Sequence, residues 1–126
     1  MASGLIGLGI DAVDVARFRD VLARRPAVVS RLFTEGERAY AERRADPAPS
    51  LAARFAAKEA VMKALGVGLG AFGWHDVEVV RAASGRPSLS VRGVAAALAE
   101  EQGVEKWQVS LTHTAAFAQA VVAALH

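Results

Sequence analysis

Two carboxylates, Asp11 and Glu59, have the sequence surroundings that a reactive site would need. Asp11 follows the short apolar segment Leu5 to Ile10, which is typical of a buried strand, and Glu59 lies in a run of helix-forming residues. A chain without cysteine or paired histidines is poorly suited to zinc, whereas Mg²⁺ prefers one or two carboxylates with water and phosphate oxygens. The pattern therefore points to a magnesium site. Taken from its local sequence alone, Asp11 is better explained as a helix cap or turn residue.

Groups that would complement phosphate surround Glu59 in sequence. Arg54 and Lys63 supply positive charge, and Gly66, Gly68 and Gly70 would let backbone N–H groups approach an anion. The pattern is not a Walker loop, because that motif places its glycines before a helix. Here the glycines follow the helix, so a helix cap and a loop explain them equally well.

His113 lies in the segment Ser110 to Thr114, among three hydroxyl groups. Histidine in such surroundings can bind phosphate or act as a base. No acid lies nearby in sequence to complete a serine triad, and Ser110 is not in a nucleophile elbow. The structural alternative is a histidine at the end of a strand, hydrogen-bonded to its neighbours.

A basic ridge is expected near the N-terminus. Arg17, Val21 and Arg24 are spaced so that they share one face of a helix, with an apolar residue between two charges. A solvated face is the usual explanation of such charges. The alternative is a docking surface for an acidic helical protein, where the charges would steer the encounter.

Residues 51–65 are predicted to form a long helix with an unusual distribution of charge. Leu51, Phe55, Met62 and Leu65 would form one apolar stripe, and Lys58 falls inside it. Charge against a packed face must be paired, bind a ligand, or cost several kcal/mol. The simpler alternative is an ion pair between Glu59 and Lys63, four residues apart, with Lys58 reaching solvent.

The elements needed to position these residues suggest one α+β domain, residues 1–126, with a mostly antiparallel sheet packed against the long helix. A capping box at Thr34 and Glu37 is expected to open a helix, and Ser50 to cap the long one. The predicted strands are 5–10, 74–81, a strand containing Leu89 and Val91, 107–112 and 116–125; the predicted helices are about 15–24, 34–44, 51–65 and 93–102.

Composition narrows the protein class. The 126 residues are 53% apolar and 22% charged, with no cysteine and a net charge of +2. Disulfides are excluded, and the small net charge does not suggest a nucleic-acid partner. The N-terminus has no basic region of the signal-peptide type, and no apolar run is long enough to span a bilayer. We therefore expect a cytoplasmic protein without a nucleic-acid or membrane partner.

Four segments resemble motifs of the holo-[acyl-carrier-protein] synthases, the small bacterial 4′-phosphopantetheinyl transferases, and they occur in the order of that family. Trp74, Asp76 and the segment Gly85 to Pro87 are similar to the family as well. Together the matches cover nearly the whole chain. The four segments are Gly7 to Asp11, Phe33 to Tyr40, Ala53 to Gly66, and Ser110 to Thr114.

The resemblance implies transfer of the phosphopantetheine arm of coenzyme A to a serine of an apo acyl carrier protein, with release of adenosine 3′,5′-bisphosphate. It implies that Asp11 and Glu59 ligate Mg²⁺ and that Lys63 holds the pyrophosphate. Glu59 is the candidate for activating the serine, either directly or through a metal-bound water. The residues expected to contact coenzyme A are Arg54, Lys63, Gly66, Gly68, Pro87, Thr112, His113 and Thr114.

The resemblance also implies a homotrimer whose active sites lie between subunits, with the carrier protein docked on Arg17, Val21 and Arg24. Two other functions are possible from the residues. A nucleotide-phosphate-binding module without catalysis would need Lys63 and His113 but not both acids. An RNA-binding domain would need aromatic residues on a sheet face, whereas aromatic content is only 6%.

Overall fold

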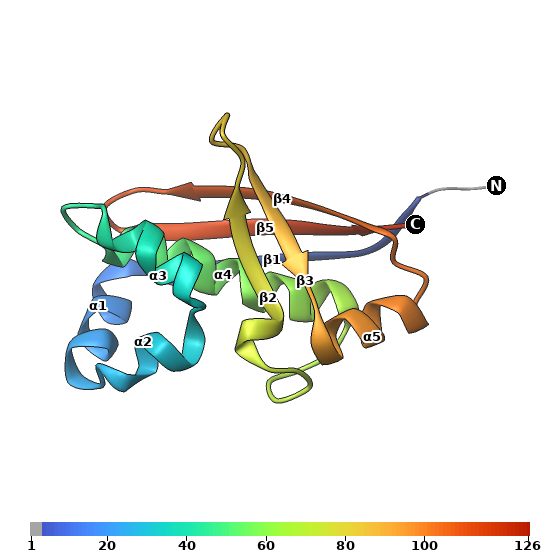
Figure 1. Ribbon diagram of the computed structural model, residues 1–126, viewed down its shortest axis with the longest axis horizontal. Coiled ribbons are helices and arrows are strands. Elements are labelled where there is room, and N and C mark those ends of the chain that lie inside the picture. Colours follow the sequence, from blue (N-terminus) through green and yellow to red (C-terminus); the bar gives the residue numbers. More distant parts are fainter. Residues whose placement is uncertain (1–3) are drawn as a thin grey trace.

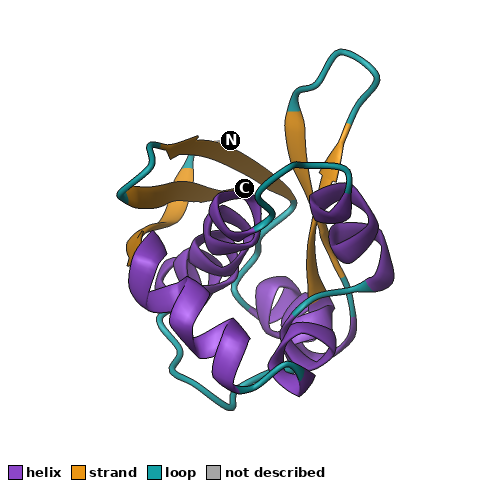
Figure 2. Ribbon diagram, turned by 90° about the vertical axis from the view of Figure 1, so that its left-hand side faces the viewer, coloured by secondary structure: helices purple, strands orange, loops and turns teal. Residues whose placement is uncertain are grey.

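The computed structural model describes residues 4–126 and has the expected α+β fold (Figure 1). In Figure 2 one group of strands lies at the upper left above most of the helices, and the hairpin strands on the right run down beside helices. Within residues 4–126, no helix is both long and apolar enough to cross a bilayer. The elements are β1 (Leu5–Asp14), α1 (Val15–Arg24), α2 (Ala27–Leu32), α3 (Glu35–Glu42), α4 (Ala48–Leu65), the 3₁₀ helix η1 (Trp74–Asp76), β2 (Val77–Arg81), β3 (Pro87–Val91), α5 (Gly93–Glu101), β4 (Lys106–His113) and β5 (Phe117–Leu125).

The larger sheet has the strand order β1-β5-β4, and both pairings are antiparallel. Alternate residues of β5 point inward and are small: Ala118, Ala120, Val122 and Ala124 are all buried. Small side chains on this face let α4 lie close to the sheet. A separate antiparallel hairpin is formed by β2 and β3.

Two glycines of β1 bring its backbone against α4. A Cβ added at Gly7 would lie 1.8 Å from the carbonyl oxygen of Ala64, and one at Gly9 would lie 1.8 Å from that of Ala60. No side chain fits in that space, so only glycine permits this approach. Glycines within a strand often mark such a close approach of another backbone.

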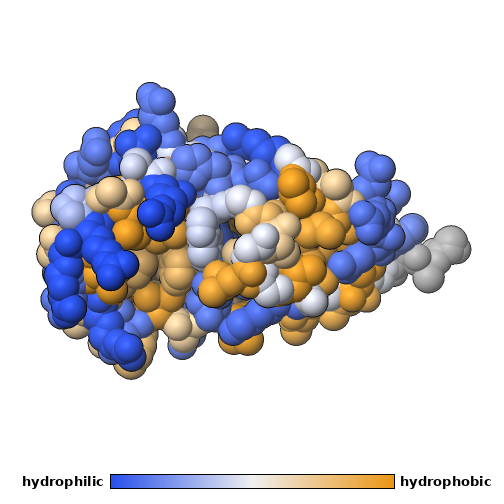
Figure 3. All heavy atoms as spheres, turned by 90° about the horizontal axis from the view of Figure 1, so that it is seen from below, coloured by the Kyte–Doolittle hydropathy of each residue, from blue (hydrophilic) through white to orange (hydrophobic). Residues whose placement is uncertain are grey.

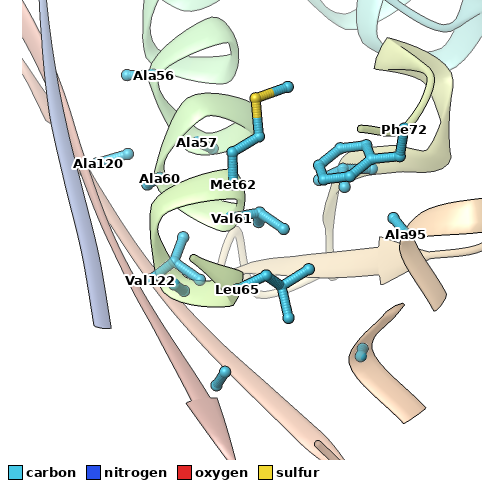
Figure 4. Packing of buried hydrophobic residues seen from close by; sticks show 14 of the residues in the cluster. Ala56, Ala57, Ala60, Val61, Met62, Leu65, Phe72, Ala95, Ala120 and Val122 are labelled. Atoms are coloured by element: carbon cyan, nitrogen blue, oxygen red, sulfur yellow. The ribbon is translucent and has the colours of Figure 1, made fainter. Parts of the chain in front are cut away.

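Helix α4 is central rather than amphipathic. The larger sheet covers one side of it, and α1, α3 and β2 pack on other sides. Figure 4 shows Ala56, Ala60 and Leu65 of this helix in the same cluster as Ala120 and Val122 of β5. The prediction of a single apolar stripe was therefore wrong, because most faces of the helix are buried by different neighbours. Phe55 is only half-buried.

Lys58 is the charge inside this core, and it is fully buried. Its Nζ lies 2.8 Å from Oε1 of Glu37 and donates to the carbonyl oxygens of Trp74 and Val77. Glu37 Oε2 also accepts a hydrogen bond of 2.9 Å from the backbone N–H of Val79. Burial lowers the pKa of the Lys58 ammonium, and the charge of Glu37 opposes that change. The alternative of a lysine reaching solvent was wrong; Lys58 ties α3, α4 and β2 together.

Several predicted boundaries need correction. Strand β1 continues to Asp14 because β5 pairs with it along that length, so Asp11 lies within the strand opposite Ala120. Helix α2 was not predicted, and β2 begins at Val77 because η1 occupies the three residues before it. Helix α4 begins at Ala48, so Ser50 does not cap it.

Other local predictions are confirmed. Thr34 and Glu37 form a capping box at α3, with hydrogen bonds of 3.0 and 3.2 Å. Gly66 has the left-handed conformation of a helix C-terminus, with φ of 70°. The explanation of Asp11 as a helix cap was wrong, because Asp11 lies within β1 and Asp14 caps α1 by accepting a hydrogen bond of 3.0 Å from the N–H of Arg17.

Candidate active site

Asp11, Glu59 and Lys63 meet where β1 crosses α4. Lys63 Nζ lies 3.2 Å from Asp11 Oδ1 and donates a hydrogen bond of 2.9 Å to the carbonyl oxygen of Ile10. Asp11 and Glu59 line one open pocket of about 350 Å³. The alternative of an ion pair between Lys63 and Glu59 was wrong, because Lys63 pairs with Asp11 from the neighbouring strand.

The electrostatics of this pocket favour a cation. Burial raises the pKa of the Glu59 carboxyl, the negative charge of Asp11 raises it further, and Lys63 opposes the change. Within residues 4–126, no group of three or more acidic, histidine or cysteine side chains could hold a metal ion. Two carboxylates with an open side therefore fit a hard cation whose remaining ligands are water or phosphate oxygens, as Mg²⁺ prefers.

The basic ridge of α1 adjoins the same pocket. Arg17 and Val21 line it together with the aromatic rings of Phe18 and Phe55, whose centroids lie 5.3 Å apart. Arg24 is exposed in the last turn of α1 and is not among the residues lining this pocket. Figure 3 shows hydrophilic residues, with apolar ones between them, at the end of the molecule where α1 and α2 lie.

A second pocket, of about 320 Å³, collects positive charge elsewhere in the chain. Arg54, Thr112 and His113 line it, as do three residues that the sequence analysis did not place at a site: Tyr40, Arg44 and Arg81. Tyr40 lies near the C-terminus of α3, Arg44 lies in the turn after it, and Arg81 ends β2. Tyr40 and Arg44 are near neighbours in sequence, but only the folded chain brings Arg81 and Arg54 to them.

Arg54 is buried in the wall of the second pocket. Its Nη1 donates a hydrogen bond of 2.9 Å to Ser50 Oγ, and its guanidinium carbon lies 4.2 Å from the centroid of the Tyr40 ring. Its Nε has no hydrogen-bond partner among residues 4–126. Burial, and then the positive charge of Arg81, lower the pKa of the Arg54 guanidinium.

The other residues expected to contact coenzyme A lie in different places. Thr114 Oγ1 accepts hydrogen bonds of 3.1 Å from the N–H groups of Ala116 and Phe117, and so organises the turn between β4 and β5. Pro87 lines a groove of about 440 Å³ between the hairpin and β4. Gly66 ends α4 directly after the turn that carries Lys63. Gly68 lies in the following loop, with open space where a Cβ would be.

Comparisons with known proteins show which family the chain resembles. Residues 7–124 match the model of the 4′-phosphopantetheinyl transferase superfamily. A holo-[acyl-carrier-protein] synthase of Streptomyces coelicolor is 51% identical over 120 residues, which are 95% of this chain and 97% of that protein.

Solved structures of the same kind superpose closely. The holo-[acyl-carrier-protein] synthase of Neisseria meningitidis has a TM-score of 0.86 and 29% identity, covering 96% of this chain and 98% of that one. The Helicobacter pylori enzyme, solved in complex with coenzyme A, has a TM-score of 0.81 and 27% identity, covering 94% and 99%. From the matching family model and these similarities, the chain belongs to the holo-[acyl-carrier-protein] synthases of the 4′-phosphopantetheinyl transferase superfamily.

Proposed function

We propose that this enzyme transfers 4′-phosphopantetheine from coenzyme A to a serine of an apo acyl carrier protein in a Mg²⁺-dependent reaction. The observation that carries the proposal is the meeting of Asp11, Glu59 and Lys63 beside the basic helix α1. The two carboxylates could bind Mg²⁺ and the Lys63 ammonium could bind a diphosphate. The adjoining basic helix could bind a protein substrate. Relatives named as holo-[acyl-carrier-protein] synthases, one of them solved with coenzyme A, support the choice of substrates.

The reaction is a phosphoryl transfer at the diphosphate of coenzyme A. The serine oxygen forms a bond to the phosphorus of the phosphopantetheine group, and the bond from that phosphorus to the bridging oxygen breaks. Adenosine 3′,5′-bisphosphate leaves with the electron pair. Glu59 would accept the serine proton.

Positioning and charge carry most of the catalysis in such a transfer. Asp11 and Glu59 would hold Mg²⁺, which supplies neutralisation of charge on the diphosphate when it is bound. Lys63 would bind a diphosphate oxygen, because its ammonium already lies beside Asp11. Gly66 and Gly68 would let the backbone approach the same part of the substrate. Arg54, Thr112, His113, Thr114 and Pro87 would contact the nucleotide.

We place the carrier protein on Arg17, Val21 and Arg24 of α1. Carrier proteins present an acidic helix beside the serine that is modified, and a basic helix adjoining the reactive pocket complements it. The chain lacks cysteine and does not need an oxidising compartment, so the proposed place of action is the cytoplasm. The whole chain, residues 1–126, would act as one transferase domain.

We also propose a homotrimer with each active site between two subunits. The outer face of the larger sheet exposes a row of apolar side chains, which is typical of an interface. Moreover, the pocket of Asp11 and the pocket of Arg54 have no lining residue in common. A neighbouring subunit would bring its Arg54 pocket to the partner's acids, so that both serve one molecule of coenzyme A.

Intact-protein mass spectrometry tests the reaction directly. An apo acyl carrier protein incubated with this enzyme, coenzyme A and Mg²⁺ is expected to gain the mass of one phosphopantetheine group. The gain should disappear with EDTA and with Glu59→Gln. No gain with several different apo carriers, despite measured binding of coenzyme A, would replace the proposal with a binding module that has no catalytic activity.

A further inference from the structure

Three guanidinium groups surround the ring of Tyr40 at the second pocket. Their carbon atoms lie 4.2 Å (Arg54), 5.0 Å (Arg44) and 5.4 Å (Arg81) from the ring centroid, within the range of cation–π contacts. Arg44 also donates a hydrogen bond to the Tyr40 hydroxyl. One neutral side chain on α3 therefore contacts cations from three different parts of the fold.

The acids near this cluster are paired elsewhere within residues 4–126. Asp46, which lines the pocket, pairs with Arg19; Glu78, which lines an adjoining pocket together with Tyr40, Arg54 and Arg81, pairs with Arg92. Glu37 is held by Lys58 in the core. The three arginines therefore keep their positive charge for a ligand, and the unpartnered Nε of buried Arg54 is further evidence that the cluster is incomplete without one.

The aromatic ring of Tyr40 attracts the guanidinium groups without forming ion pairs with them. A carboxylate at this position would form ion pairs with the arginines and compete with a ligand, whereas an aliphatic side chain would offer no attraction to the guanidinium groups. The ring is itself fixed, because α3 is anchored at its start by the capping box and by the buried pair of Glu37 with Lys58.

We propose that Tyr40 is a positioning residue that holds Arg44, Arg54 and Arg81 around the 3′-phosphate monoester of coenzyme A. This inference rests on the proposed function, which supplies the substrate. Coenzyme A carries two separate anionic groups, a diphosphate and a monoester on the ribose. The diphosphate belongs with Asp11, Glu59 and Lys63, and a cluster of arginines with no paired acid suits the dianionic monoester.

The test compares coenzyme A with dephospho-coenzyme A, which lacks only the monoester, in Tyr40→Leu and Tyr40→Phe. Tyr40→Leu should lower kcat/KM for coenzyme A about tenfold, mainly through KM, and change kcat/KM for dephospho-coenzyme A less than about twofold. Tyr40→Phe keeps the ring and should retain most of the activity with coenzyme A. Phe33→Leu, a buried aromatic change in the same region, is the control for lost packing and should leave the ratio between the two substrates unchanged.

An equal loss with both substrates in Tyr40→Leu would overturn the inference and leave Tyr40 a structural role. Equal use of both substrates by the unaltered enzyme would overturn it too. If the enzyme made no holo carrier protein at all, the proposed function would fail separately. Calorimetry would then decide the inference by comparing the binding of adenosine 3′,5′-bisphosphate and adenosine 5′-phosphate. The bisphosphate should bind more tightly to the unaltered enzyme. In Tyr40→Leu this difference in affinity should be lost, while the affinity for adenosine 5′-phosphate should stay the same.

Discussion

At the scale of single residues, Asp11 and Glu59 hold charge that the fold does not require. Neither lies in the buried network around Lys58, and among residues 4–126 Asp11 is paired only with the partly exposed Lys63. Asp11→Asn and Glu59→Gln keep the shape of each side chain and remove its charge. Each variant is expected to lower turnover at least about a thousandfold, because each removes a proposed metal ligand and Glu59→Gln also removes the proposed proton acceptor.

Circular dichroism and the mass assay together check this prediction. Both variants should give the spectrum and the melting temperature of the unaltered protein, or a slightly higher melting temperature, since one of two neighbouring like charges is removed. Glu101→Gln, which changes an exposed acid on α5, is the matched control and should keep full activity. Unfolding of either site variant would mean that these acids serve the structure rather than a metal.

At the scale of elements, the ion pair of Lys58 with Glu37 is where α3, α4 and β2 depend on one another. Lys58→Met would leave the Glu37 carboxylate buried without its partner, so we expect a loss of about 3–5 kcal/mol in the free energy of unfolding. Adding Glu37→Gln should recover part of that loss, because the unpaired charge is then removed. Urea unfolding followed by circular dichroism measures both. Equal stability of Lys58→Met and the unaltered protein would contradict the assigned role.

The contact of β1 with α4 gives a second prediction at this scale. Gly9→Ala would place a methyl group 1.8 Å from the carbonyl oxygen of Ala60, so strand and helix must separate. We expect a loss of about 1–3 kcal/mol or more in thermal or urea unfolding. Gly4→Ala is the control, since nothing lies within 4 Å of its added Cβ. If both variants were equally stable, the close approach would not be needed for the fold.

Elements were predictable from sequence where local chemistry decides them. Thr34 and Glu37 close a capping box within four residues, and Gly66 ends α4 by its own conformation. Prediction failed where distant partners decide: β5 extends β1 to Asp14, and neighbours on several sides make α4 a central helix. The site divides in the same way. Lys63 was identified from its own helix, but its pairing with Asp11, and the approach of Arg44 and Arg81 to Tyr40, depend on tertiary packing.

At the scale of the whole molecule, the outer face of the larger sheet has no helix packed against it within residues 4–126. Its exposed apolar side chains include Leu8 and Ile10 on β1 and Phe117 and Val121 on β5, with exposures of 59%, 59%, 51% and 38%. Ile10 and Val121 are direct cross-strand neighbours, so the row continues from one strand to the next. A continuous apolar surface of this kind is better explained by a second copy of the chain than by water.

Ile10→Asp tests whether this face joins the subunits of the proposed trimer. It would place a charge among the exposed apolar side chains without touching the inner face of the sheet, so a trimer should dissociate into monomers. Light scattering after size-exclusion chromatography should give the mass of three chains for the unaltered protein and of one chain for Ile10→Asp. Transfer activity should fall with the mass, because each active site is proposed to need a neighbour's Arg54 pocket. Val94→Asp, an equally apolar and exposed position on α5, should alter neither. An unaltered protein that is monomeric and fully active would contradict the proposal of an active site shared between subunits. The Arg54 pocket would then have to act together with Asp11 and Glu59 of its own chain.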